Sequence, residues 1–258
     1  MLAGRARLRY GPPVPPQQPT APIVAIDGPA GAGKSTVARQ LAKRLGLSII
    51  DTGAIYRSVA LAARRAGIGW DDDEGLRSLL ESPPGLGLTF VPLPDAEGGQ
   101  RVLLHGHDVT AAIRTPEISR GASVVSARAV VRERLLGLQR ELGRKATTGA
   151  VLEGRDIGTV VFPDAPVKFF LTASDEARAQ RRFAELSDKG LSVHLEDVLR
   201  DQRRRDADDT DREIAPLRAA ADAIVVDTTR LHLEQVIDRC ELLARSRLAS
   251  VGANPAAP

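Results

Sequence analysis

Residues 23–36 read IVAIDGPAGAGKST, in which a short β-branched apolar run leads directly into the pattern Gly-x-x-x-x-Gly-Lys-Ser. Glycines allow successive backbone N–H groups to turn inward on a phosphate, and a helix beginning near Lys34 directs the positive end of its dipole at the same anion. An amphipathic helix pattern follows, with apolar residues at Val37, Leu41 and Leu45. The segment therefore predicts a P-loop, in which a strand, a phosphate-binding turn and a helix follow one another.

The loop predicts a division of roles among its side chains. Lys34 is expected to reach the β- and γ-phosphates of a nucleotide, and Ser35 to ligate Mg²⁺ through its hydroxyl oxygen. A glycine-rich turn that binds nothing is the alternative, and the flanking strand and helix argue against it. The predicted nucleotide-binding residues are Gly28, Pro29, Ala30, Gly31, Ala32, Gly33, Lys34, Ser35 and Thr36.

Composition narrows the class of protein. With 258 residues and 43% hydrophobic content, the chain can bury one large core or two small ones. It contains no run of about 18 apolar residues and no long apolar segment near its N-terminus, so neither a membrane span nor a secretory signal is expected. Cys240 is the single cysteine, which excludes a disulfide within the chain and a thiolate metal cluster. We expect a cytoplasmic protein in which Cys240 packs in a helix.

The charge pattern does not favour nucleic acid as a partner. The formal net charge is only +3, aromatic residues make up 3% of the chain, and aspartates and glutamates are interspersed among the arginines. Binding to nucleic acid would need a contiguous basic surface with aromatic side chains on which bases can stack. Nucleic-acid binding is therefore a weak alternative.

The order of apolar patterns predicts an α/β fold. Short runs of strand type lie at 23–26, 48–50, 151–153, 167–171 and 223–227. Longer helical patterns lie at 35–45, 54–66, from 174 onward, 195–205 and 233–248. Strands that alternate with helices in this way predict a parallel sheet flanked by helices.

Other segments depart from this alternation. Residues 1–20 are proline-rich and lack periodicity, and they predict a disordered leader, as 251–258 predict a disordered tail. Residues 70–130 predict an inserted subdomain on the substrate side, with antiparallel strands at 86–91 and 101–104. The predicted core is then 21–69 and 131–250. Within it, Arg181–Gly190 is expected to separate two helices and to belong to a mobile lid at about 180–192.

Three charged motifs follow predicted strands or helices. Asp51–Arg57 reads DTGAIYR, Glu153–Gly158 reads EGRDIG, and Arg205–Arg212 reads RDADDTDR. The first two lie at the carboxyl ends of strands, where ligands of such folds bind, so Arg57 can hold a second phosphate, and Arg155 and Asp156 can face a common cleft. Taken singly, Arg57 is better explained by a solvated helix face, Arg155 and Asp156 could be a surface ion pair, and the third motif would ordinarily be a solvated loop.

Taken together, these motifs make the chain similar to the bacterial cytidylate kinases. The resemblance covers about Ile23 to Leu248 and includes GPAGAGKST, DTGAIYR, HGHDVTAAIRTPEIS, GRDIGTVVFPDAPVKFFL, and RDADDTDR followed by IAPL. It implies a P-loop NTPase-type parallel sheet flanked by helices, with an inserted monophosphate-binding subdomain and a short lid. It also implies an enzyme that transfers the γ-phosphate of ATP to CMP or dCMP with the help of Mg²⁺.

The resemblance assigns roles to matching positions. It places the CMP phosphate on Arg57, Arg155 and Arg212, the cytosine edge on Ser123, Arg132 and Asp156, and the sugar hydroxyls on Arg205 and Asp209. Thr52 joins these CMP-binding residues, and Lys34, Arg155 and Arg212 are the predicted catalytic residues. Asp51 or Glu153 is expected to reach the metal ion through water.

Two other readings remain. A GTPase-type switch would need a base-reading N/T-K-x-D segment, which the sequence lacks. A P-loop kinase acting on UMP, AMP, shikimate or another small acceptor is the closer alternative, and the set Ser123, Arg132 and Asp156 favours cytosine instead. The resemblance further suggests a monomer.

Overall fold

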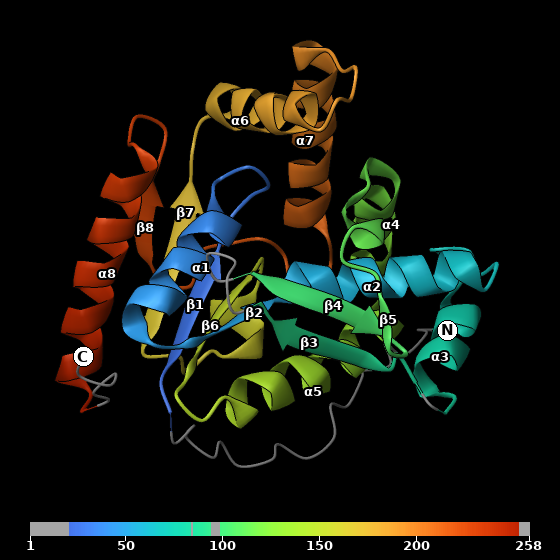
Figure 1. The fold of residues 1–258 in the computed structure, drawn as a ribbon, viewed down its shortest axis with the longest axis horizontal. Helices are drawn as coiled ribbons and strands as arrows, with labels where there is room; N and C mark the ends of the chain where they lie inside the picture. The colour runs from blue at the N-terminus through green and yellow to red at the C-terminus, as the bar shows by residue number, and fades with distance from the viewer. Residues whose placement is uncertain (1–20, 84, 94–98, 253–258) are drawn as a thin grey trace, which may run out of the picture.

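The structure, a computed structural model, describes residues 21–83, 85–93 and 99–252. Its centre is a five-stranded parallel sheet with the strand order β2-β6-β1-β7-β8 (Figure 1). The strands are β1 (Ile23–Asp27), β2 (Ser48–Asp51), β6 (Ala150–Gly154), β7 (Val167–Thr172) and β8 (Ile224–Asp227). The strands predicted from the apolar runs are thereby confirmed, and the fold is the α/β fold of P-loop NTPases.

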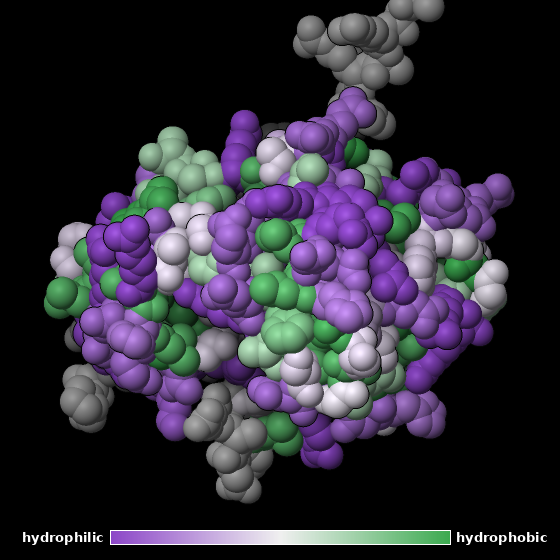
Figure 2. All heavy atoms as spheres, turned by 90° about the horizontal axis from the view of Figure 1, so that it is seen from above, coloured by the Kyte–Doolittle hydropathy of each residue, from purple (hydrophilic) through white to green (hydrophobic). Residues whose placement is uncertain are grey.

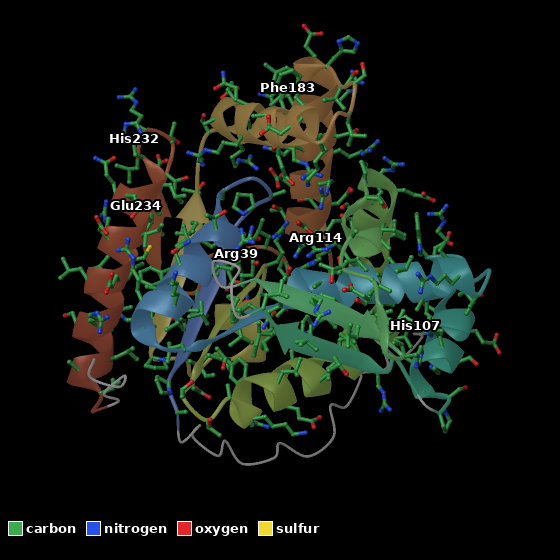
Figure 3. The ribbon with its side chains drawn as sticks, viewed as in Figure 1. Arg39, His107, Arg114, Phe183, His232 and Glu234 are labelled. Atoms are coloured by element: carbon green, nitrogen blue, oxygen red, sulfur yellow. The ribbon has the colours of Figure 1, made fainter. Side chains whose placement is uncertain are left out.

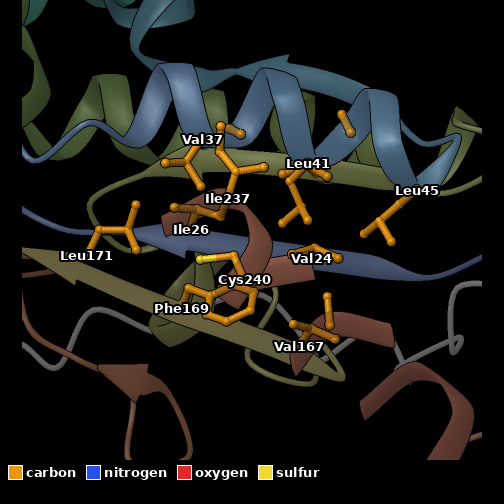
Figure 4. Packing of buried hydrophobic residues seen from close by; sticks show 14 of the residues in the cluster. Val24, Ile26, Val37, Leu41, Leu45, Val167, Phe169, Leu171, Ile237 and Cys240 are labelled. Atoms are coloured by element: carbon orange, nitrogen blue, oxygen red, sulfur yellow. The ribbon is translucent and has the colours of Figure 1, made fainter. Parts of the chain in front are cut away.

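The central strand β1 is covered on both faces, which explains why all five of its residues are apolar or buried. Val24 and Ile26 face helices α1 (Lys34–Leu45) and α8 (Leu233–Ser250). They pack with Leu41 of α1 and with Phe169 of the neighbouring strand β7 (Figure 4). Cys240 of α8 lies in the same cluster and is fully buried. Its predicted packing role is confirmed, and burial raises the pKa of its thiol to about 12.

The opposite face of β1 carries the alternate side chains, as a strand's period of two requires. Ile23 and Ala25 pack with Leu152 and Phe162, beneath helix α5 (Ala129–Lys145) and the single helical turn η2 (Ile157–Val161). The sheet therefore has helices on both faces, and its strands end together at one edge.

A second hydrophobic cluster is built around helix α2 (Thr52–Arg65). Its elements are α3 (Asp73–Glu81), β3 (Leu88–Pro92), β4 (Gln100–Leu104), β5 (His107–Asp108), η1 (Ala112–Arg114) and α4 (Pro116–Ala127). The predicted antiparallel pair is confirmed, since Leu88 lies opposite Leu104, and β5 adds a third strand. Helix α3 was not predicted, although Asp72 caps it and Leu76 and Leu80 give it a buried face.

One prediction about local structure is wrong. Arg181–Gly190 does not separate two helices, because helix α6 (Asp175–Asp188) runs through most of it before α7 (Leu195–Asp211) begins. Ser174 caps α6, and Phe183 packs between α6 and α7 against a small cluster of Ala179, Leu186 and Val198 (Figure 3). This apolar contact with the next helix stabilises the last turns of α6.

Several predictions fall outside the described residues, among them the leader at 1–20 and most of the tail at 251–258. The division into a core, an insert at 70–130 and a lid at 180–192 stays a prediction. Among the described residues, no helix is both long and apolar enough to cross a membrane. The face in Figure 2 is mostly hydrophilic, with hydrophobic residues scattered between.

Candidate active site

A cleft of about 1170 Å³ opens at the carboxyl edge of the sheet, between the P-loop, α2, α4 and α7. It brings together segments that are distant in the chain, and every predicted site residue except Gly28 and Pro29 lines it. The predicted residues along its wall are Ala30, Gly31, Ala32, Gly33, Lys34, Ser35, Thr36, Thr52, Arg57, Ser123, Arg132, Arg155, Asp156, Arg205, Asp209 and Arg212.

The P-loop depends on its glycines for two different reasons. At Gly28, with φ +147°, a Cβ atom would lie 2.0 Å from the carbonyl oxygen of Leu171, so any side chain would collide with the backbone of β7. Gly33 has φ +88° and no atom near its missing Cβ, so it is needed for its left-handed conformation alone. Helix α1 starts at Lys34 with no side-chain cap on Gly33, which leaves its first N–H groups to bind an anion.

Lys34 lies inside this loop. Its side chain is buried, and Nζ donates a hydrogen bond to the carbonyl oxygen of Pro29 at 2.7 Å. Burial, and then the nearby cation of Arg155, lower the pKa of Lys34 to about 7. An anionic ligand in the loop would favour the charged form, so the lysine is placed to pair with phosphate oxygens.

Several oxygen atoms that could bind a cation lie beside Lys34. The hydroxyl of Ser35 donates to Oε2 of Glu153 at 2.7 Å, and Thr52 donates to the carbonyl oxygen of Glu153 at 2.6 Å. Burial, and then the neighbouring carboxylate of Asp51, raise the pKa of Glu153 to about 7. A buried carboxylate next to a second one and a hydroxyl suits a hard cation such as Mg²⁺.

These residues therefore fit a Mg²⁺ ion that would be bound by only a few protein atoms. Among the described residues, no group of three or more histidine, cysteine, aspartate or glutamate side chains could form a metal site by itself. Mg²⁺ ordinarily keeps several of its waters and is held by one or two protein oxygens together with substrate phosphates, and the Ser35 hydroxyl and the Glu153 carboxylate offer such oxygens.

Arginines face the P-loop from the other side of the cleft. Arg155 donates to Oδ2 of Asp209 at 2.7 Å, and Arg212 donates to the carbonyl oxygen of Ala215 at 2.6 Å. Arg57, on α2, pairs with Asp51 at 2.8 Å. Within the described part of the chain, three buried guanidinium nitrogens have no hydrogen-bond partner: Nε of Arg57, Nε of Arg205, and Nη2 of Arg212, which lies 3.9 Å from Oδ1 of Asp156.

Such unpartnered donors are unusual, because buried polar groups are nearly always hydrogen-bonded. Burial is the main reason that the pKa values of Arg205 and Arg212 are lowered, followed by a neighbouring arginine in each case. Closely spaced cations with free N–H groups form a site that an anion would complete.

Farther along the cleft, Arg132 forms a buried ion pair with Asp156. Its guanidinium also donates to the carbonyl oxygen of Ser126 at 3.1 Å and stacks over the ring of Tyr56, 5.7 Å from the ring centre. Ser123, on α4, also lines the cleft, and its hydroxyl makes only a long hydrogen bond of 3.4 Å within its own helix. This end of the cleft therefore offers a donor and an acceptor side by side.

Sequence reasoning missed two aspartates that hold the site together. Asp27, at the end of β1, accepts hydrogen bonds from the backbone N–H groups of Ile157 at 2.8 Å and Gly158 at 2.7 Å, and so fixes the turn after Asp156. Asp206 of α7 accepts from the N–H of Ala30 at 3.3 Å. The position of Asp27 directly before the first glycine of the P-loop was the available signal, but its partners lie about 130 residues away.

Asp27 leads to a prediction about stability and pH. Burial raises its pKa from 3.8 to about 6, although its two backbone hydrogen bonds act in the opposite direction. Because the folded pKa lies above the unfolded one, the proton on Asp27 stabilises the fold below about pH 4, and this stabilisation is lost as the pH rises to about 6. Relative to Asp27→Asn, the wild type should lose about 3 kcal/mol of unfolding free energy across that window.

Urea titrations of both proteins between pH 4 and 8 measure this difference. Asp73→Asn serves as the control, because Arg128 holds the pKa of Asp73 below its usual 3.8, so the contribution of Asp73 changes only below about pH 4 and the difference from wild type should stay nearly constant between pH 4 and 8. If the difference in unfolding free energy between the wild type and Asp27→Asn does not change between pH 4 and 6, the argument that burial raises the pKa of Asp27 is contradicted.

Comparison with known proteins agrees with this geometry. The family model described as cytidylate kinase matches residues 24–245. A cytidylate kinase of Geobacter sulfurreducens is 54% identical over 225 residues, which is 87% of this chain and 93% of that protein. Cytidylate kinases of Geobacter sp. strain M21 and Syntrophotalea carbinolica are 52% and 51% identical, covering 88% and 84% of this chain and 94% and 89% of theirs.

The matched region begins in β1 and ends in α8, so it includes the P-loop, the arginines and the whole cleft. The resemblance that the motifs indicated is confirmed over most of the chain. The chain therefore belongs to the cytidylate kinase family of ATP-dependent phosphotransferases.

Proposed function

We propose that the cleft transfers the γ-phosphoryl group of ATP to the phosphate of CMP or dCMP. The observation that carries this proposal is that Arg57 and Arg212, each with a buried guanidinium nitrogen that has no hydrogen-bond partner among the described residues, line the same cleft as the P-loop. A phosphate cradle on one wall and an anion site on the other suit two phosphorylated substrates. A switch that binds one nucleotide would have no use for the second anion site.

In this proposal the protein acts through position and charge. The P-loop N–H groups and Lys34 hold the β- and γ-phosphates of ATP, while Arg57, Arg155 and Arg212 hold the phosphate of CMP. Their cations bring two anions together for in-line transfer and stabilise the charge that develops on the moving phosphoryl group. A phosphate nucleophile is already anionic near neutral pH, so no residue is assigned as a general base.

Mg²⁺ is assigned to Ser35, with Glu153 or Asp51 bound to its waters. When bound, the ion would neutralise charge on the β- and γ-phosphates. The hydrogen bond from Ser35 to Glu153 supports this placement, because it already aligns the hydroxyl and the carboxylate at the head of α1.

The pair Arg132 and Asp156 is assigned to cytosine. A carboxylate can accept a hydrogen bond from the exocyclic amine of cytosine, and a guanidinium can donate to its ring nitrogen and carbonyl oxygen. Ser123 supplies a further hydroxyl, and Thr52 lines the same path. Arg205 and Asp209 are assigned to the sugar hydroxyls, which leaves dCMP as an acceptor beside CMP.

The insert at 70–130 would then serve the acceptor and the lid at 180–192 the donor. Arg181 and Arg182 of α6 line the cleft, where Arg181 donates to Thr228 at 2.9 Å and Arg182 to Glu185 at 2.7 Å. Both arginines are thus paired with protein groups, and a bound triphosphate would compete for them.

A coupled assay for nucleoside diphosphate formation tests the proposal. The purified chain is offered ATP and Mg²⁺ with CMP, dCMP, UMP, AMP or shikimate in parallel. Strong turnover of CMP with dCMP close behind is expected, because the base site presents an acceptor to the cytosine amine. Turnover confined to UMP, AMP or shikimate would overturn the assignment of Ser123, Arg132 and Asp156, and no turnover at all would overturn the phosphotransfer proposal.

A further inference from the structure

One face of helix α7 lies along the cleft. Gln202, Arg205, Asp206 and Asp209 occupy positions i, i+3, i+4 and i+7, which share one side of an α-helix. Asp206 binds the P-loop through the N–H of Ala30, and Asp209 binds Arg155 of the predicted acceptor site. This face of α7 therefore bridges the two halves of the cleft.

Gln202 is the member of this face for which the proposed function has no role. Its side chain is 5% exposed, and its Nε2 atom is enclosed with no hydrogen-bond partner in the structure. Buried amide groups are nearly always hydrogen-bonded, so a donor left free beside a cleft points to a ligand. No neighbouring side chain in the hydrogen-bond network of α7 accepts from it.

The position of Gln202 indicates which ligand. Its Oε1 atom lies 3.3 Å from the point where a Cβ atom of Gly31 would stand, so the carboxamide oxygen lies against the P-loop, and Nε2, the other branch of the same group, is the atom left without a partner. Gln202 also lies one turn of α7 before Arg205 and two turns before Asp209. It therefore lines the cleft beside the P-loop, on the face of α7 that also carries Arg205 and Asp209.

We propose that Gln202 is a further substrate-binding residue, whose amide donates a hydrogen bond to the terminal phosphate of the bound nucleoside triphosphate. The inference rests on the proposed function and extends it by naming a group that recognises the phosphoryl group to be transferred. A neutral donor suits this place, because a third cation beside Arg155 and Lys34 would repel both.

This role has a consequence for nucleotide selection. A nucleoside diphosphate in the same cradle lacks the terminal phosphate, so it would leave Gln202 without a partner. Gln202 should therefore favour the triphosphate over the diphosphate product, and it should contribute little to the binding of CMP.

The test compares the affinities of ADP and a β,γ-imido analogue of ATP, each with Mg²⁺, by titration calorimetry. Gln202→Leu keeps most of the side-chain volume and removes the amide. We expect its affinity for the analogue to fall about tenfold, with ADP affinity changed by less than about twofold, since a hydrogen bond to a charged group is lost. The value of kcat should fall by at least as much, while the KM for CMP stays near its wild-type value.

Gln139→Leu is the matched control. Gln139 is also a buried glutamine, but it lies on α5 and its Nε2 donates to the carbonyl oxygen of Leu135. Gln139→Leu should leave the ratio of the affinity for the ATP analogue to the affinity for ADP unchanged. If Gln202→Leu does not fold, as judged by circular dichroism, Gln202→Met provides the same comparison with a more flexible side chain.

Three results would overturn the inference: equal losses for ADP and the analogue, no loss for either, or a change confined to the KM for CMP. These are distinct from failure of the proposed function, which would appear as absent turnover by the wild-type protein with every acceptor.

Discussion

Lys34→Ala should lower kcat for ADP formation from ATP and CMP by about 10³-fold or more. Lys34 is buried inside the P-loop and is held by a single hydrogen bond to the carbonyl oxygen of Pro29, so its cation is available to phosphate oxygens. It would stabilise charge that grows on the phosphoryl group during transfer, and that contribution is made mainly in the transition state. The loss should therefore appear in kcat more than in the KM for CMP.

The fold should survive this substitution. Burial disfavours the charged form of Lys34, so removing the cation relieves a cost instead of breaking a stabilising pair. Steady-state kinetics and a thermal melt on the same preparation separate the two effects. Lys43→Ala is the control, because Lys43 lies in the last turn of the same helix on its exposed side. A Lys34→Ala enzyme within tenfold of the wild-type kcat would remove Lys34 from the catalytic residues.

Asp156→Asn should reduce kcat/KM for CMP by about 10³-fold, while activity with UMP falls less or rises. A carboxylate only accepts hydrogen bonds, so it matches the cytosine amine and is mismatched with the carbonyl oxygen of uracil. An asparagine can turn its amide to donate to that oxygen. The ratio of CMP to UMP turnover, measured with both acceptors under the same conditions, is the quantity that should change most.

This substitution also removes a counterion. Arg132 and Asp156 are both buried, and Arg212 lies 3.9 Å from the same carboxylate. Leaving two buried arginines without it should cost about 3 kcal/mol of unfolding free energy. Asp73→Asn breaks a partly exposed pair with Arg128 and should change neither selectivity nor stability by a comparable amount. An unchanged CMP to UMP ratio in a folded Asp156→Asn enzyme would show that another group selects the base.

The two predictions concern opposite walls of one cleft, and the structure joins those walls at two points. Asp27 connects the end of β1 to the turn that carries Arg155 and Asp156. Asp206 and the buried Arg178 connect α6 and α7 to the P-loop, since Arg178 donates to the carbonyl oxygen of Ala30 at 2.8 Å. Displacement of either link would therefore alter the distance between the donor and acceptor phosphates.

Much of the fold follows from local patterns. The P-loop, the five core strands and the flanking helices are set by short apolar runs and by glycines whose backbone conformation excludes other residues, as at Gly28. Such signals lie within a few neighbouring residues, so a single sequence displays them. Helix α3 and the full length of α6 were missed because their apolar faces are short and are completed by partners elsewhere, such as Val198 against Phe183.

The features of the site also fall into those that local sequence determines and those that tertiary structure determines. By itself, the sequence determined the phosphate cradle, the family and the arginines that gather opposite the cradle, because each belongs to a contiguous motif. Tertiary structure alone decided which of those arginines have free donors, that Asp27 and Asp206 anchor the loops, and that Gln202 rests on Gly31. The anchoring contacts join segments more than 100 residues apart, and local residue patterns carry no record of such contacts.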